Sequence, residues 1–261
     1  MDESYQTYLN RVAKMTLPAT YESQVKNIQR SPKFRLNEDG TQAPVSFPGY
    51  SAITPPGAED PGNSAVFKDL AACQQQLIEK LEPDLLVLVD PASFHFTLAD
   101  LIWDSAYLTA VATNADFESK LVDCIADSFK IYQDALVDPT PIRWQIMGLT
   151  VRPRAIEVSL VPKDESSYDR IIALRRAIYQ NSSLMALGIE QQYYFTAHTT
   201  LAYFANVQQE IDRVRLSDTL QAYNTHWLDN PQEITLAHGQ LRKFTDMYTY
   251  QREPNFPIVQ L

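Results

Sequence analysis

FHFTLADL, residues 94–101, is the stretch of the chain that says most about its fold. Side chains of an extended strand alternate between two faces, so His95 and Thr97 point to one side while both phenylalanines and the first leucine point to the other. This alternation predicts a strand that packs its apolar face into a core and presents an imidazole and a hydroxyl on the opposite face. Taken alone, the segment fits either a functional site or a histidine that is hydrogen-bonded for structural reasons.

A second segment, TAHTTLAYF at residues 196–204, repeats this pattern. Thr200 stands two residues after His198, and the hexapeptides HFTLAD and HTTLAY share His, Thr, Leu and Ala at four of six positions. The two histidines are 103 residues apart, which is enough chain for one lobe, so the sequence predicts an imperfect duplication with one such strand in each half. The other histidines, His226 and His238, lack the pattern, and we expect them to be structural or surface residues.

The composition is that of an ordinary globular protein with an acidic balance. The 32 acidic and 22 basic residues give a formal net charge of -10, and no dense Lys/Arg run occurs. Long nucleic acid is bound largely through basic side chains on its phosphates, so we exclude it as a partner and retain a small nucleotide or cyclic phosphate, or a short RNA end. Without a signal-peptide pattern or a long apolar run, we expect a soluble, cytoplasmic protein that contacts no membrane.

The order of periodic patterns predicts an N-terminal helical extension over residues 1–48 and a bilobal domain over 49–261. The extension has helical patterns broken near Leu17-Pro18 and then turn-forming residues, and we expect it to wrap on the surface of the main body. The Pro/Gly-rich loop at 54–64 fits either a mobile flap or a plain connection. Helical patterns cover 65–81, 115–136, 164–180 and 206–224, and strand patterns cover 49–54, 84–90, 94–101, 142–153, 155–162, 191–204, 233–244 and 246–253.

Several common site motifs are excluded. No two glycines have the spacing of a dinucleotide-binding loop, and neither HExxH nor GxSxG occurs. Cys73 and Cys124 lie far apart, which favours neither a disulfide framework nor a thiolate metal site. His95 and His198 could bind a metal together with Asp100, but threonine hydroxyls are poor zinc ligands. We therefore expect no metal and no cofactor.

The paired motifs His95-Phe96-Thr97-Leu98 and His198-Thr199-Thr200-Leu201 resemble those of the two-histidine phosphoesterase superfamily, which includes RNA-end cyclic phosphodiesterases and RNA ligase-like proteins. The resemblance covers roughly residues 49–252 as an order of elements. It implies an α+β fold of two pseudo-symmetric lobes. Each lobe is expected to hold an antiparallel or mixed sheet with outer helices, and the lobes are expected to face each other across a central groove.

The resemblance also implies a metal-independent phosphodiesterase that acts on a cyclic phosphodiester. His95 and His198 would serve as general acid and base, in an order that the sequence leaves open, and Thr97 and Thr200 would hold the non-bridging phosphate oxygens. The alternative is a non-catalytic module that binds a nucleotide or a protein on the same fold. Further candidates, none of them assigned, are cations on or beside strands and aromatic residues that could stack a base: Arg143, Arg152, Arg242, Lys243, Tyr50, Trp144, Tyr203 and Tyr248.

Overall fold

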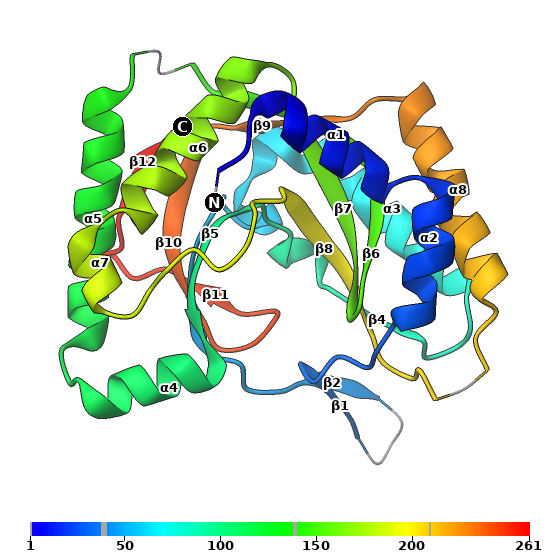
Figure 1. Ribbon diagram of the computed structural model, residues 1–261. Helices are drawn as coiled ribbons and strands as arrows, with labels where there is room; N and C mark the ends of the chain where they lie inside the picture. The colour runs from blue at the N-terminus through cyan, green and yellow to red at the C-terminus, as the bar shows by residue number, and fades with distance from the viewer. Residues whose placement is uncertain (1, 38–40, 138–139, 209) are drawn as a thin grey trace.

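The structure is a computed structural model that describes residues 2–37, 41–137, 140–208 and 210–261. Two five-stranded sheets, each flanked by helices, form two lobes (Figure 1), and a two-stranded ribbon stands apart from both sheets. Every strand pairing between described residues is antiparallel. The predicted α+β class with two facing lobes is therefore confirmed.

The sheet of the first lobe has the strand order β11-β10-β3-β5, and β12 also pairs with β10. It combines strands from the first half of the sequence with strands from the C-terminal end. Its members are β3 (Gly49–Ile53), β5 (Thr97–Trp103), β10 (His238–Phe244), β11 (Tyr250–Gln251) and β12 (Ile258–Gln260).

The sheet of the second lobe has the order β4-β8-β7-β6-β9. One strand of this sheet, β4, comes from the segment just before His95 and pairs with β8. The two lobes thus exchange strands, and neither corresponds to one continuous half of the chain. Its members are β4 (Leu86–Leu88), β6 (Ile142–Arg152), β7 (Ala155–Pro162), β8 (His198–Phe204) and β9 (Glu233–Leu236). The separate ribbon pairs β1 (Phe34–Leu36) with β2 (Gln42–Pro44).

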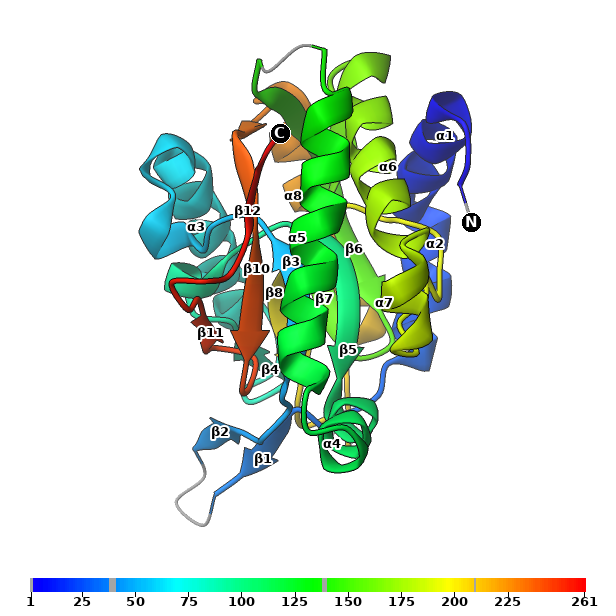
Figure 2. The same cartoon turned by 90° about the vertical axis from the view of Figure 1, so that its left-hand side faces the viewer.

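Helices cover the outer faces of the sheets. Figure 2 shows α5 lying along the first lobe, where it contacts β12, while α8 packs on β6 of the second lobe. The helices are α1 (Tyr5–Met15), α2 (Pro18–Gln24), α3 (Ser64–Lys80), α4 (Asp104–Thr113), α5 (Phe117–Ala135), α6 (Glu165–Tyr179), α7 (Ser182–Ala186) and α8 (Arg213–Asp229). Two of them, α4 and α7, have no counterpart among the sequence predictions, and α8 begins seven residues later than expected.

The loop at 54–64 is held in place. It contains two short 3-10 helices, η2 (Gly57–Glu59) and η3 (Pro61–Asn63). The carboxylate of Glu59 pairs with the buried guanidinium of Arg242 at 2.5 Å, and the Asn63 side-chain amide donates to the carbonyl oxygen of Thr235 at 2.8 Å. These contacts favour the plain connection over the mobile flap.

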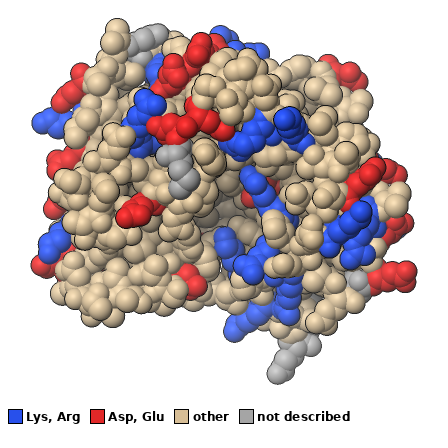
Figure 3. Space-filling view, in the orientation of Figure 1, with Lys and Arg blue, Asp and Glu red and all other residues tan. Residues whose placement is uncertain are grey.

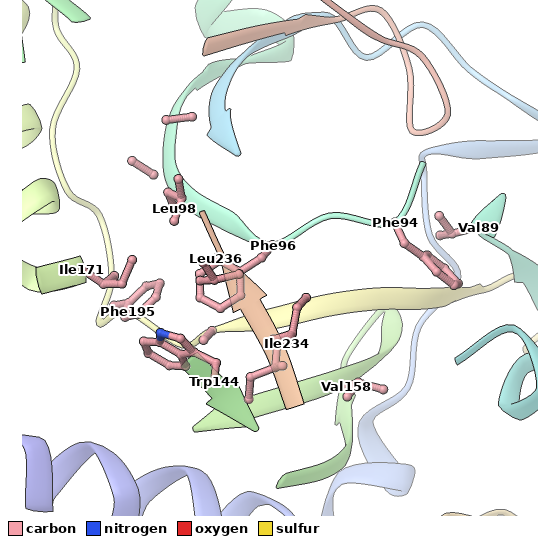
Figure 4. Packing of buried hydrophobic residues seen from close by; sticks show 14 of the residues in the cluster. Val89, Phe94, Phe96, Leu98, Trp144, Val158, Ile171, Phe195, Ile234 and Leu236 are labelled. Carbon is pink, nitrogen blue, oxygen red and sulfur yellow. The ribbon is translucent and has the colours of Figure 1, made fainter. Parts of the chain in front are cut away.

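A cluster of aromatic rings joins the two lobes behind their facing surfaces (Figure 4). Phe96 from the first histidine segment and Phe195 from the second both pack edge-on against Trp144 of β6, with ring centroids 5.3 and 6.0 Å away. Phe96 and Trp144 are fully buried. The apolar face predicted from the alternation at residues 94–98 is therefore the core face.

The N-terminal helices pack on the second lobe. The buried hydroxyl of Tyr8 donates to the carbonyl oxygen of Leu160 at 2.8 Å and accepts from the backbone N–H of Ala197 at 3.0 Å. The hydroxyl of Tyr21 donates to the carbonyl oxygen of Leu149 at 2.5 Å. Across the described ranges, none of the helices has the length and apolar character needed to span a membrane.

Candidate active site

A cavity of about 970 Å³ lies between the two lobes, and all four residues predicted for the site line it: His95, Thr97, His198 and Thr200. In Figure 3 the surface is hollowed near the centre of the molecule, with Lys and Arg side chains on one side of the hollow. Strand β5 carries Thr97, and β8 carries His198 and Thr200. His95 precedes β5 by two residues, so the first histidine stands at the entry to its strand and not within it.

Both imidazoles are oriented by the same local contact. His95 Nδ1 lies 2.7 Å from the carbonyl oxygen of Ser93, and His198 Nδ1 lies 2.7 Å from the carbonyl oxygen of Thr196. In each case the acceptor is two residues before the histidine. A nitrogen that faces a carbonyl must carry the hydrogen, so in the neutral ring Nε2 is left as a proton acceptor. The repeat of the hexapeptide is therefore accompanied by an equivalent orientation of the two rings.

Each lobe also has a β-bulge at the same place. In the pairing of β5 with β3, Thr97 and Ala99 face consecutive residues of β3, so Leu98 has no partner there. In the pairing of β8 with β7, the residue without a partner is Leu201. An extra residue reverses the alternation beyond it. As a result, the sixth residue of each hexapeptide, Asp100 or Tyr203, returns to the cavity.

Burial keeps His95 neutral. It lowers the pKa of the His95 imidazole to about 4, with a further contribution from the positive charge of His198 and against the hydrogen bond to the Ser93 carbonyl. The ring of Tyr250 covers His95 with its centroid 4.4 Å away. His95 is therefore available as a base down to acidic pH.

A carboxylate lies within ion-pair distance of the second histidine. Glu157 Oε1 lies 3.7 Å from His198 Nε2, and Glu157 Oε2 accepts from Arg152 Nε at 2.9 Å. Burial opposes ionisation of Glu157, but His198 and Arg152 outweigh it and lower its pKa. Glu157 faces Thr200 in the second sheet, whereas the residue facing Thr97 in the first sheet is Ile53. The two histidines are thus equivalent in geometry and different in charge environment.

Of the unassigned candidates, Arg152 and Tyr203 line the cavity. Several others make contacts of their own: Trp144 is in the core, Arg242 pairs with Glu59, and Lys243 donates to Glu118 at 2.6 Å. The two histidines outside the motif fit the expected structural or surface role: His238 Nε2 is 3.1 Å from the side-chain amide of Gln240, and His226 is half exposed near Asp69. Within the described parts of the chain, no three His, Cys, Asp or Glu side chains are grouped closely enough to hold a metal ion.

The N-terminal segment contributes residues to the cavity that were not predicted from the sequence. Gln29, Ser31, Pro32, Lys33 and Phe47 all line the cavity. They belong to a turn-rich stretch without periodicity, and no signal in the sequence marks them as site residues. The sequence did contain an indication that Asp100 lines the cavity, because Asp100 occupies the same place in its hexapeptide as Tyr203.

Comparison with known proteins shows that this chain is similar to solved structures in its fold alone. No protein-family model matches the chain, and no curated protein matches it. A solved structure of a conserved protein of unknown function from Agrobacterium tumefaciens is similar with a TM-score of 0.56 and 13% identity, over 89% of this chain and 96% of that chain.

Two other solved structures are similar at lower scores. One is a phosphoesterase (TM-score 0.43, 13% identity, 83% of this chain and 100% of that chain). The other is Escherichia coli LigT complexed with 3'-AMP (TM-score 0.41, 12% identity, 82% and 95%). Below a TM-score of 0.5 these two likenesses carry no conclusion for this chain. The likeness to the Agrobacterium protein shows a shared two-lobed fold.

Proposed function

We propose that the protein is a metal-independent phosphodiesterase that hydrolyses a cyclic phosphodiester by paired histidine acid/base catalysis. The substrate would be a 2',3'-cyclic nucleotide, a nucleotide-sugar cyclic phosphate or a short RNA end. One observation carries the proposal: His95 and His198 come from equivalent positions in two lobes, are oriented by equivalent hydrogen bonds and line one cavity. The resemblance of the two motifs to the two-histidine phosphoesterase superfamily supports it.

The asymmetry between the lobes suggests which histidine does what. His95, neutral because it is buried, would take a proton from water as the water oxygen attacks phosphorus. His198, whose Nε2 lies 3.7 Å from the Glu157 carboxylate, would give its proton to the ribose oxygen as the bond from phosphorus to that oxygen breaks. Thr97 and Thr200 would donate hydrogen bonds to the non-bridging oxygens. The product would be a phosphomonoester.

The test is turnover of 2',3'-cyclic nucleotides by the purified protein in the presence of EDTA. We expect His95→Ala and His198→Ala each to lower kcat by about 10²- to 10⁴-fold, the usual contribution of one general acid or base. His226→Ala is the matched control, since His226 lies outside the cavity, and it should retain the wild-type rate. Turnover that EDTA abolishes, or that survives loss of either motif histidine, would overturn the proposal.

A non-catalytic module that binds a nucleotide or a protein is the second candidate. Binding of a nucleotide by the wild-type protein without turnover, across a panel of cyclic and linear phosphodiesters, would support this candidate.

A further inference from the structure

Lys33 is a cation in the cavity that comes from neither histidine strand. Its half-buried side chain places the amine 4.7 Å from the ring centroid of Phe47 and 5.1 Å from that of Tyr203. Within the ranges that the structure describes, Lys33 forms no ion pair. Aromatic faces attract the charged form of a lysine, and an amine held over them can receive an anion on its remaining side.

The backbone around Lys33 is fastened to both lobes. The N–H of Ser31 donates to the carbonyl oxygen of Phe204 at the end of β8 at 2.8 Å. Farther along, the N–H of Phe47 donates to the carbonyl oxygen of Thr245, just after β10, at 2.9 Å. Ser31 is thus fastened to the second lobe and Phe47 to the first, and Lys33 is positioned by the backbone contact two residues before it.

The other charges near the cavity leave Lys33 available. The carboxylate of Glu157 pairs with Arg152, and the carboxylate of Asp100 accepts a hydrogen bond from the hydroxyl of Tyr193. Burial lowers the pKa of the Lys33 amine, while the more distant charges of Asp100 and Glu157 raise it. An incoming phosphate would supply the close counter-charge that this amine lacks.

Lys33 also lies on the side of the cavity where Thr200 stands. Tyr203, whose ring contacts the Lys33 amine, belongs to β8 and lies three residues after Thr200. Thr200 and Tyr203 both line the cavity, and burial raises the pKa of the Tyr203 phenol. Lys33, Tyr203 and Thr200 therefore form a continuous set from the N-terminal segment to the second motif.

We propose that Lys33 binds the phosphate group of the substrate beside Thr200, so that the N-terminal segment supplies a positive charge which the two histidine strands do not provide. This inference rests on the proposed function, because it names the residue that would hold the substrate's anionic group. It makes Ser31, Lys33 and Phe47, which line the cavity, part of the site.

The experiment uses the full chain and two probes, inorganic phosphate in a calorimetric titration and a 2',3'-cyclic nucleotide in steady-state kinetics. Lys33→Met keeps an apolar side chain over Phe47 and Tyr203 and removes the charge. We expect it to weaken phosphate binding and to raise KM by about tenfold or more each, with a smaller change in kcat. Lys33→Arg should recover most of the binding.

Arg35→Met is the matched control, because Arg35 lies two residues after Lys33 in the chain and is exposed outside the cavity. It should bind phosphate as the wild-type protein does. If Lys33→Met turns over the nucleotide with unchanged KM and binds phosphate with unchanged Kd, the Lys33 proposal is wrong and the proposed function stands. If phosphate binding depends on Lys33 but the wild-type protein hydrolyses no cyclic phosphodiester, the proposed function fails and the Lys33 proposal stands.

Discussion

The hydroxyl of Thr199 donates a hydrogen bond of 3.1 Å to the carbonyl oxygen of His95. Thr199 directly follows His198 and is almost fully buried, so this bond ties the two histidine segments to each other across the lobes. The rings of Phe96 and Phe195 meet on Trp144 behind the same place. The positions of the two imidazoles are therefore coupled through their immediate neighbours in the chain.

Thr199→Val should weaken this coupling. The substitution keeps the shape of the side chain and removes the donor, which leaves the His95 carbonyl without that partner and costs about 1–3 kcal/mol of unfolding free energy. We expect kcat to fall while KM changes little, as measured by urea unfolding and steady-state kinetics. Thr199→Ser retains the hydroxyl and should restore both quantities. An unchanged kcat in a destabilised Thr199→Val protein would show that the bond serves stability alone.

The buried state of His95 predicts how stability depends on pH. Its pKa is lowered from 6.5 to about 4, so between these values the unfolded chain binds a proton there that the folded chain does not. The free energy of unfolding should therefore decrease as pH falls through this window, by on the order of 1–3 kcal/mol from His95 alone. His95→Gln should reduce the slope relative to wild type in urea unfolding at a series of pH values. His226→Gln should keep the wild-type slope.

The same pKa predicts the acid limb of the pH–rate profile. If His95 is the base, it stays neutral and active until the pH approaches about 4. The logarithm of kcat/KM should therefore stay level through pH 6.5, where an ordinary histidine begins to lose activity as a base. An acid limb centred near 6.5 would contradict the assignment of His95 as the base.

Glu157 should matter for rate more than for binding. Glu157→Gln removes the carboxylate that stabilises the positive charge on His198, and we expect kcat to fall by about ten- to a hundredfold, equivalent to about 1.4–2.8 kcal/mol. Arg152→Gln removes the other partner of the same ion pair but retains the carboxylate, and it should lower kcat less. Equal losses in the two variants would indicate that the ion pair acts by holding the structure together.

The buried hydroxyl of Tyr8 predicts a link between helix α1 and the second histidine. Tyr8→Phe leaves the N–H of Ala197 and the carbonyl of Leu160 without a partner, at a cost of about 1–3 kcal/mol for each unsatisfied group. Because Ala197 immediately precedes His198, kcat should fall together with stability. Tyr5→Phe, on the same helix, is the control for both measurements. Wild-type kinetics in Tyr8→Phe would show that the contacts of α1 do not affect catalysis.

The features that the sequence revealed are those that depend on local periodicity. Alternation at residues 94–98 predicted the core face of Phe96 and the cavity face of His95, because pleated chains alternate whatever their tertiary surroundings. Repetition of the hexapeptide predicted that His198 would have an equivalent place. The spacing of apolar residues over many turns predicted helix α5. Helix α4 was not predicted, because its apolar residues do not gather on one face.

What the sequence concealed depends on pairing between distant segments. Asp100 reaches the cavity only because a bulge at Leu98 reverses the alternation, and single-strand periodicity does not reveal a bulge. Lys33 is placed by backbone bonds to strands of both lobes, in a segment whose own residues form turns. The predicted strand over 191–204 begins only at His198. The residues before His198 are not in a strand, and they place Tyr193 and Thr196 at the cavity.

The exchange of strands between the lobes has a consequence for how the molecule assembles. A polypeptide ending after β5 would lack the C-terminal strand β10, which pairs with β3, and one beginning after β5 would lack β4, the edge partner of β8. Neither fragment has a complete sheet to bury, so the two lobes should form together in one cooperative transition, with slow kinetics set by contacts between the chain ends. The two lobes are therefore interdependent for folding.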